Sequence, residues 1–555
     1  MSSCLDNARP ETAPAETSRF RPAIHFTAGD TWLNDPNGLV FYDGMYHLFF
    51  QNNPYGNTWG NMSWGHATSR DLLHWTEHPV AIACDETEDI FSGSVVVDHG
   101  NTSGLGTPDS PALVAIYTSA YKAGSEHSGT QAQSLAYSTD AGMTWRKYEG
   151  NPVLTRNSAN FRDPKVFRYQ GDQGACWVMA AVEAQHQKVV LYRSEDLKTW
   201  DFLSDFGPAN ADAGEWECPD LFPLAVDGDP ENIKWVLIVN VNPGAVAGGS
   251  GGQYFIGHFN GVSFTPDPGS VVAPEGLASL PDSKAGSAAL QQCLWLDWGR
   301  DCYASVSFSN APDDRRIIIG WMNNWDYANE LPTAPWRSSM TLAREVCLTA
   351  VNGSAHLIQQ PVLAGLCAGE EPAETQNVMD AGTFELHDSV FRLPDAVPGS
   401  AQVIETEILP GDAEQVTFHL LGIGDGSAGT VLSYNAATAE LVLDRRRSGD
   451  TGFHGKFPSV ESAPLVLEDG ALKLHIVVDH CSVEVFAQDG KVVLTDLVFP
   501  AQGHAENRLT IEGGPATIRT LTVTALGYRQ RTDKQEGSPK PTVQHTDVDL
   551  AGAQK

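Results

Sequence analysis

Short runs of β-branched and aromatic residues, separated by Gly, Asn, Asp and Pro, fill most of the chain from residue 21 to residue 528. Long segments with an apolar residue every three or four positions, the pattern of an amphipathic helix, are nearly absent. Short runs bounded by turn residues are typical of β-strands. The sequence therefore predicts an all-β fold.

The domain organisation follows from length and local composition. The chain has 555 residues, more than one hydrophobic core usually organises, so we expect at least two domains. Residues 360–378 are rich in Ala, Gly and Glu and predict a linker between a first domain at 21–359 and a second at 379–528. Residues 1–20 and 529–555 are polar and predict disordered ends.

A serine–turn–tryptophan unit occurs three times in the first domain, at Ser69–Trp75, Ser138–Trp145 and Ser194–Trp200. Each unit follows a predicted strand. We interpret it as a hairpin turn whose tryptophan fills the gap between neighbouring sheets. Repeated units of this kind are typical of β-propellers.

Five strand-like segments each begin with polar residues, and their starts lie 57 to 81 residues apart, enough for a four-stranded blade each. If these are the innermost strands, their starts converge on a central channel. The strand spacing after residue 379 suits a two-sheet sandwich. We therefore predict a five-bladed β-propeller followed by a C-terminal β-sandwich, although the spacing is also compatible with four or six blades. The five starts are Asp35, Ser92, Asp163, Asp220 and Asp301.

The net charge of the chain disfavours some classes of binding partner. The formal net charge is −34, which opposes binding to nucleic acid or to anionic membranes, because both depend on Lys and Arg. No run of 18 apolar residues predicts a membrane span. The polar N-terminus lacks the apolar stretch of a signal peptide, so at face value we expect a cytoplasmic protein, or a secreted one if the sequence was trimmed.

Nine cysteines are scattered along the chain, without a CxxC pair and without zinc spacing to histidines. This pattern predicts buried free thiols and neither a disulfide framework nor a metal site. The sequence leaves open whether the chain forms a homo-oligomer.

Three carboxylate motifs are the candidates for chemistry. A single Asn-Asp-Pro-Asn-Gly sequence is usually a surface turn, because each of its residues favours turn geometry. Two further carboxylate motifs later in the chain weaken that interpretation and favour a shared site. The motifs are Trp32–Gly38, Phe161–Pro164 and Trp216–Asp220.

Hydrolysis of a glycosidic bond usually needs one ionised carboxylate and one carboxylic acid with a raised pKa. Asp35 suits the ionised group, because amides of its turn can bond the carboxylate. Glu217 suits the acid, since its neighbours offer little polarity. From the residues alone, Glu215 and Asp220 stay open as alternatives to Glu217, and so does an exposed strand-end carboxylate without function.

Asp163 follows Arg162 directly in the sequence. The adjacent cation would favour the ionised form of Asp163, which suits a fixed acceptor for substrate hydroxyls. The alternative is a local surface ion pair worth about 0–1 kcal/mol.

The three motifs, in this order, resemble those of glycoside hydrolase family 32, the family of invertases, inulinases and levanases. The resemblance spans roughly residues 22 to 527, and it is greatest to exo-acting fructan β-fructosidases. Further matching stretches are Gln51–Pro54, Trp59–Asn61, Trp64–Ser69, Phe91–Ser94, Gln253–Gly257 and Ile319–Trp325.

The resemblance implies a five-bladed propeller followed by a sandwich, and retaining hydrolysis of β-fructofuranosides such as levan, inulin or sucrose, without metal or organic cofactor. It implies Asp35 as nucleophile, Asp163 as transition-state stabiliser and Glu217, instead of Glu215, as acid/base. The residues that it implies for holding the fructosyl unit are Asn34, Gln51, Trp59, Ser92, Arg162 and Trp321.

Three other functions stay open at this point. A fructosyltransferase of the same family would use the same carboxylates. A propeller hydrolase that acts on arabinans would use a similar trio with inverting chemistry. A protein that binds fructan without cleaving it would use the second domain as a lectin.

Overall fold

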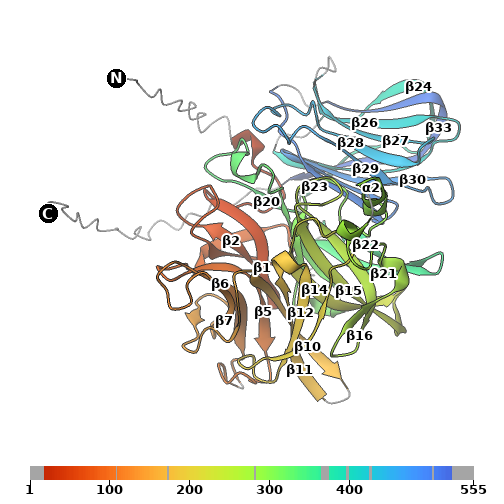
Figure 1. Ribbon diagram of the computed structural model, residues 1–555. Coiled ribbons are helices and arrows are strands. Elements are labelled where there is room, and N and C mark those ends of the chain that lie inside the picture. The colour runs from red at the N-terminus through yellow and green to blue at the C-terminus, as the bar shows by residue number, and fades with distance from the viewer. Residues whose placement is uncertain are drawn as a thin grey trace, which may run out of the picture.

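The computed structural model describes residues 18–107, 109–171, 174–280, 283–363, 374–395, 399–423, 428–502 and 506–527. Strands dominate these ranges, and α2 (Ser283–Leu290) is the one α-helix assigned within them (Figure 1). The predicted all-β class is confirmed. The expected disordered ends lie outside the described residues, except for the short 3-10 helix η1 (Ser18–Phe20).

The N-terminal part begins with three antiparallel sheets, each formed by strands that are consecutive in the chain. The first contains β1 (Trp32–Tyr42), β2 (Met45–Asn53), β3 (Ser63–Ser69) and β4 (Trp75–Ile82). The second contains β5 (Glu88–Asp98), β6 (Ala112–Tyr121), β7 (Gln131–Ser138) and β8 (Arg146–Lys147), with β9 (Leu154–Ser158) also on β7. The third contains β10 (Phe161–Gly171), β11 (Gly174–Glu183), β12 (Lys188–Ser194) and β13 (Asp201–Phe206).

A nine-stranded sheet follows, in which two groups of strands are joined by one parallel pairing, Val226 with Leu348. The first group contains β14 (Glu215–Val226), β15 (Asp229–Asn242), β16 (Gly251–Phe259) and β17 (Phe264–Pro266). The second contains β18 (Tyr303–Ser307), β19 (Ile317–Met322), β20 (Ser339–Met340), β21 (Arg344–Val351) and β22 (Ser354–Pro361).

The first strands of these groups lie beside one another in chain order: β1 contacts β5, β5 contacts β10, β10 contacts β14 and β14 contacts β18. The series closes, because β18 also contacts β1 and Ser309, just after β18, forms a parallel bridge with Val40. These inner strands therefore surround one axis, and side chains from distant parts of the sequence can meet there.

The serine–turn–tryptophan units are confirmed as hairpin turns, and each joins the third strand of a sheet to the fourth. In each unit the serine hydroxyl accepts a backbone N–H from the turn, and the tryptophan indole donates to the carbonyl three residues earlier. The turn is thus held by side chains that the unit itself supplies. The serine bonds are Leu72 N to Ser69 Oγ (2.8 Å), Gly142 N to Ser138 Oγ (2.9 Å) and Leu197 N to Ser194 Oγ (2.8 Å).

The C-terminal part is a sandwich-like arrangement of eleven strands in one hydrogen-bonded sheet. The long β33 (Glu506–Gly527) pairs with β23 (Glu374–Asp380), β24 (Phe384–Arg392), β25 (Ser400–Leu409) and β26 (Gln415–Gly422). The others are β27 (Thr430–Asn435), β28 (Glu440–Asp444), β29 (Val460–Pro464), β30 (Leu472–Asp479), β31 (Ser482–Ala487) and β32 (Val492–Leu497). The predicted linker at 360–378 starts within β22 and ends within β23, and residues 364–373 lie outside the described ranges.

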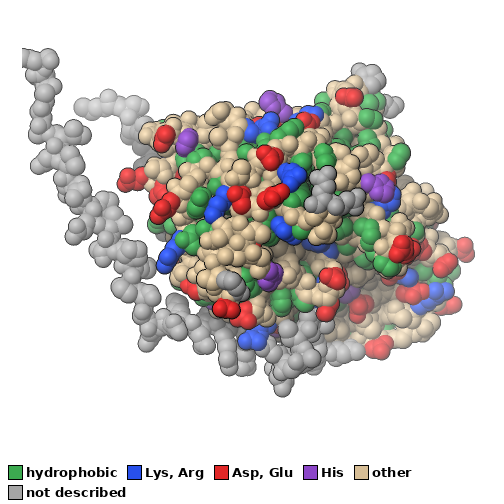
Figure 2. Space-filling model, turned by 90° about the horizontal axis from the view of Figure 1, so that it is seen from below, with side chains coloured by type: hydrophobic (Ala, Val, Ile, Leu, Met, Phe, Trp, Pro, Cys, Tyr) green, Lys and Arg blue, Asp and Glu red, His purple; other side chains and the backbone are tan. Residues whose placement is uncertain are grey.

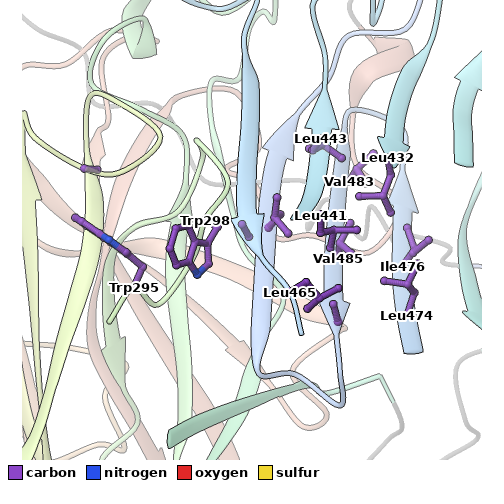
Figure 3. Packing of buried hydrophobic residues seen from close by; sticks show 14 of the residues in the cluster. Trp295, Trp298, Leu432, Leu441, Leu443, Leu465, Leu474, Ile476, Val483 and Val485 are labelled. Atoms are coloured by element: carbon purple, nitrogen blue, oxygen red, sulfur yellow. The ribbon is translucent and has the colours of Figure 1, made fainter. Parts of the chain in front are cut away.

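Buried apolar side chains of the sandwich form one cluster with side chains of the N-terminal part (Figure 3). Leu441 and Val485 are fully buried within the sandwich, and Trp298 lies beside its strands. Here the two parts also meet backbone to backbone, since Trp298 N donates to Val493 O at 2.8 Å. A Cβ at the neighbouring Gly299 would lie only 2.2 Å from Thr495 N, so glycine is required at this position.

Asp301 belongs to this domain boundary and not to the central axis. Its carboxylate forms a buried ion pair with Arg445 of the sandwich and accepts Leu497 N at 2.8 Å. The inner strand β18 starts only at Tyr303. The strand expected after Asp301 is confirmed as β18, but the expectation that Asp301 itself reaches the central axis was wrong, because its partner comes from the other domain.

A second buried ionic group ties the N-terminal segment to the sandwich. His25 Nδ1 lies 2.7 Å from Asp479 and Nε2 lies 2.8 Å from Glu484, which also pairs with Arg344 at 2.7 Å. Burial alone would lower the pKa of His25, but the hydrogen bonds to the two carboxylates raise it to about 9. The protonated imidazole is therefore part of the folded state at neutral pH.

We predict that this histidine makes stability depend on alkaline pH. Because its pKa is higher in the folded than in the unfolded state, its contribution is complete below pH 6.5 and is lost as the pH rises through about 9. The free energy of unfolding of the wild type should fall by about 3 kcal/mol over this window, and His25→Gln should remove that part of the slope. Urea unfolding at a series of pH values measures both, with the exposed His99→Gln as control. Equal slopes in wild type and His25→Gln would contradict the prediction.

Candidate active site

The three predicted carboxylates lie near the starts of inner strands, at the same relative position. Asp35 is on β1, Asp163 on β10 and Glu217 on β14. At each position the pairing with the second strand shifts register. Such a bulge turns a side chain out of the regular alternation of a strand, and it tolerates proline, which has no N–H to donate. Pro164 and Pro219 lie within these bulges, and Pro36 is the first residue that pairs again after its bulge, with Phe50.

Asp35 is held by short polar contacts. Its Oδ1 accepts Asn34 Nδ2 at 3.0 Å and its Oδ2 accepts Ser92 Oγ at 2.6 Å. Trp32 Nε1 donates to Asn34 Oδ1 at 2.8 Å and so orients that amide. Burial and the nearby Glu217 raise the pKa of Asp35, and the hydrogen bonds oppose this.

Asp163 lies beside Asp35, and its backbone is unusual. Its φ is +62°, in the left-handed region, which the bulge imposes. Its own N–H donates to Thr118 Oγ1 at 2.9 Å, and its Oδ2 accepts Cys218 N at 3.0 Å. Burial raises the pKa of Asp163 to about 7, and the charges of Glu217 and Asp35 add to this effect although Arg162 opposes it.

Arg162 does not pair with Asp163 alone, as its place in the sequence had suggested. Its Nε donates to Glu217 Oε1 at 3.1 Å but lies 3.8 Å from Asp163 Oδ2, and its Nη2 forms an ion pair with Glu215. Arg162 does favour ionisation of Asp163, as expected, but burial and the charges of Glu217 and Asp35 outweigh it, so the pKa of Asp163 is raised.

Glu217 is held from two sides. Arg162 contacts Oε1, and the hydroxyl of Tyr303, on β18, donates to Oε2. Its neighbour Glu215 is more exposed and is held by Arg162 and by Gln185, whose Nε2 lies 3.0 Å from Glu215 Oε1. Glu217 therefore lies among the other site carboxylates, whereas Glu215 lies at the rim.

Asp220 is excluded as a member of this group. It is fully buried, its Oδ2 lies 3.1 Å from Lys165 Nζ, and it accepts Ser307 N at 2.6 Å. The bulge between Glu217 and Asp220 separates them along β14. The inner strand expected after Asp220 is confirmed as β14, but it starts five residues earlier than expected, at Glu215.

Cys218 lies between the two aspartates. Its Sγ is 3.6 Å from Asp35 Oδ2 and 3.8 Å from Asp163 Oδ2. Burial and the surrounding carboxylates raise the pKa of this thiol well above its ordinary value, so it stays protonated and can donate. Cys293, Cys302 and Cys481 are also buried and free, as predicted, whereas the free Cys347 is exposed.

The remaining predicted residues lie at different distances from the carboxylates. Gln51 is buried and donates to Asn37 Oδ1 at 3.0 Å, and Asn37 in turn donates to the Asp35 carbonyl at 2.7 Å. Trp321 is fully buried against Trp32 and Tyr303, and no partner is found for its Nε1 among the described residues. Trp59 is 46% exposed, with its ring edge on Phe91, so it can meet a ligand at the mouth of the site.

The sequence did not point to Trp32, Thr118 or Tyr303. Each acts on a site residue from another part of the chain: Trp32 orients Asn34, Thr118 holds the Asp163 backbone and Tyr303 contacts Glu217. Of the three, only Trp32 could have been found from the sequence, because it lies inside the first carboxylate motif.

Within the described ranges, no group of three or more His, Cys, Asp or Glu side chains could hold a metal ion. No described helix is long and apolar enough to cross a membrane.

Comparison with known proteins identifies the family. The description "Glycosyl hydrolases family 32 N-terminal domain" matches residues 25–361, and "Glycosyl hydrolases family 32 C terminal" matches residues 370–525. The chain belongs to glycosyl hydrolase family 32. The resemblance seen in its motifs is confirmed, and the chain is a glycosidase.

Several family 32 relatives match over most of the chain. It is 41% identical over 514 residues to a levanase from Bacillus subtilis, covering 91% of this chain and 70% of the relative. It is 38% identical over 523 residues to an extracellular exo-inulinase from Aspergillus niger, covering 89% and 92%. The crystal structure of an exo-inulinase from Aspergillus awamori superposes with a TM-score of 0.81 at 36% identity, covering 92% of this chain and 99% of that one.

We predict that Asp163→Asn makes this family 32 protein more stable at neutral pH. The pKa of Asp163 is raised to about 7 in the folded state, so the folded state holds this proton more tightly than the unfolded state does. The free energy of unfolding therefore decreases as the pH rises from about 4 to 7. The neutral amide avoids this cost and can still accept Cys218 N, so the free energy of unfolding at pH 7.5 should rise by about 2 to 4 kcal/mol.

Thermal unfolding at pH 4.5 and pH 7.5 measures this effect, which should be small at the lower pH. Asp196→Asn is the matched control, since turn N–H groups lower the pKa of Asp196 and the amide should destabilise there. If Asp163→Asn melts at a lower temperature than the wild type at pH 7.5, the prediction that the buried carboxylate destabilises the fold is wrong.

Proposed function

We propose that this protein releases fructose from β-fructofuranosides, with levan, inulin and sucrose as candidate substrates, through a covalent fructosyl-enzyme. The observation that carries the proposal is that Asp35, Asp163 and Glu217 come together, with Cys218 between the two aspartates and Arg162 against Asp163 and Glu217. Relatives named levanase and exo-inulinase support the choice of fructans.

We propose further that the N-terminal part is a five-bladed propeller. The nine-stranded sheet then counts as two blades, because a single residue pair joins its two groups of strands. The closed series of five inner strands supports this count. In this fold the bulged strand starts form the wall of a funnel that receives the terminal fructosyl unit.

In the proposed reaction Asp35 is the nucleophile that attacks the anomeric C2. Ser92 and Asn34 donate to its two oxygens, so the ionised form is oriented before the substrate arrives. Attack forms the ester bond between Asp35 and C2 while the glycosidic C–O bond breaks.

Glu217 is the proposed acid/base. It gives its proton to the departing oxygen, and in the second step it takes a proton from the water that cleaves the ester. Tyr303 and Arg162 fix the two carboxyl oxygens, so the proton is delivered from one place. The positive charge of Arg162 balances the carboxylate after transfer.

Asp163 is the proposed transition-state stabiliser. Its Oδ2 is held by Cys218 N, and its hydrogen bonds to ring hydroxyls would strengthen as positive charge grows on the sugar. Asn34, Gln51, Trp59, Ser92, Arg162 and Trp321 are the proposed residues around the fructosyl unit. Of these, Asn34, Ser92 and Arg162 touch a site carboxylate, whereas Gln51 and Trp321 support the wall from behind.

We predict that Asp35→Ala and Glu217→Ala each lower kcat on sucrose and inulin by at least about 10³-fold, with a far-ultraviolet circular dichroism spectrum like that of the wild type. Glu215→Ala is the matched control, because it removes a carboxylate from the same strand and the same arginine but leaves the acid in place. It should cost much less. A near-wild-type rate of purified Asp35→Ala or Glu217→Ala would refute the assignment.

The products decide among the remaining alternatives. With a retaining enzyme, the first fructose that NMR detects is the β-furanose anomer, and the opposite anomer would indicate inverting chemistry. Free fructose alone from levan and inulin supports exo-hydrolysis, and longer oligomers from sucrose support a transferase. Activity on arabinofuranosides, or saturable binding without release of sugar, would contradict the proposed function.

A further inference from the structure

A cavity of about 600 Å³ lies on the same inner strands as the carboxylates but farther along them. Its lining residues come from the later parts of β5, β10 and β14 and from the segment after β18. On these strands the lining begins two to four positions after Ser92, Asp163 and Glu217, at Val96, Lys165 and Asp220. At about 3.3 Å per residue, the nearest lining residues lie roughly 7–13 Å farther along the strands, so the cavity follows the proposed funnel along the same axis.

Aromatic rings form one wall of this cavity. Trp235 packs on Phe167 with ring centroids 5.7 Å apart and on Tyr169 at 6.0 Å, and Trp177 lies under the guanidinium of Arg168 at 4.9 Å. Flat rings of this kind bind the apolar faces of sugars and of other ring compounds. The volume is within the range of small-molecule sites.

Most charges along the lining are already satisfied inside the protein. Lys165 pairs with Asp220 at 3.1 Å, so these two charges cancel. The Asp98 carboxylate accepts Thr102 N at 2.9 Å and Ser103 N at 2.8 Å. None of these groups requires a ligand.

Arg316 is different. It has no ion pair with any carboxylate of the described residues, and its Nη1 makes only long contacts, 3.4 Å each, to Ser307 Oγ and Phe308 O. Its Nε is buried with no hydrogen-bond partner in the described structure. The guanidinium lies over the Phe222 ring at 4.8 Å. Burial lowers the pKa of Arg316, and the charge of Asp220, which already pairs with Lys165, opposes this only in part. A bound anion would offset the remaining cost of burying this cation.

We propose that this cavity is a second binding site, for a small organic anion whose carboxylate or phosphate pairs with Arg316 and whose body lies on the aromatic wall. A planar guanidinium holds either group with two parallel hydrogen bonds. Arg168 at the rim adds positive charge at the entrance. Three cations, Lys165, Arg168 and Arg316, line this cavity against two carboxylates, although the chain has a net charge of −34. On the face that Figure 2 shows, acidic and basic side chains are interspersed.

Isothermal titration calorimetry with three related probes tests the proposal: glucose 6-phosphate, gluconate and glucose. One of the two anions, or both, should bind the wild type at one site, and which of them binds identifies the preferred group. Glucose should bind at least tenfold more weakly. Arg316→Gln should weaken anion binding at least tenfold. Absence of anion binding to the wild type, or equal binding to Arg316→Gln, would overturn the proposal.

Arg315→Gln is the matched control, because Arg315 is the neighbouring residue, pairs with Glu345 at 2.6 Å and does not line the cavity. It should bind the anions like the wild type. Both variants should keep the wild-type rate of fructose release from sucrose. If Arg316→Gln does not fold, Arg168→Glu at the exposed rim takes its place and should weaken anion binding several-fold without changing the weak response to glucose.

Discussion

One buried guanidinium makes the carboxylate cluster possible. Arg162 contacts Glu217 and Glu215 and lies near Asp163, and Asp35 feels the charge of Glu217. Carboxylates gathered in a buried space repel one another and lose hydration, so each would tend to bind a proton. A single cation shared among them leaves part of that tendency uncompensated, which explains why the pKa values of Asp35 and Asp163 are raised beside an arginine. Both raised values belong to aspartates, so the ionised Asp35 that the proposed reaction needs depends on its hydrogen bonds from Ser92 and Asn34, which oppose the rise.

The geometry of the cluster comes from a feature shared by the inner strands. Each of β1, β5, β10, β14 and β18 shifts register against its second strand near its start. In a regular strand some of these side chains would point into a neighbouring sheet. The bulges turn them toward the common axis. Three of these strands, β5, β10 and β14, continue past the bulge into the second cavity. Its wall is completed by Trp177 of β11, Trp235 of β15 and Arg316, which directly precedes β19. Lys165 and Asp220 occupy the axis between the two sites.

The sequence predicted the all-β class, the hairpin turns and the three carboxylates, because turn chemistry and short motifs are local properties. It failed where a partner comes from elsewhere in space. Asp301 resembles the start of an inner strand but pairs with Arg445, about 140 residues later. The Arg162–Asp163 neighbours suggest a simple ion pair, whereas the arginine turns to Glu217. The contact between Tyr303 and Glu217 could not be predicted, because the local sequence does not show which strands become neighbours. The separation of Glu217 from Glu215 rested on resemblance, and exposure and contacts now give it a physical basis.

The boundary between the two parts has a consequence for how substrate reaches the site. Three buried ion pairs cross this boundary, and both partners of each pair are shielded from solvent. They are formed by His25, Asp301 and Arg344 with residues of the sandwich. At Gly299 the two backbones lie too close to admit a side chain. Bending at such a boundary would strip several ions of their partners at once. The protein therefore cannot open and close like a clamshell around a polysaccharide. Discrimination among fructans of different length and branching then rests with the side chains around the site and not with a movement of the two parts.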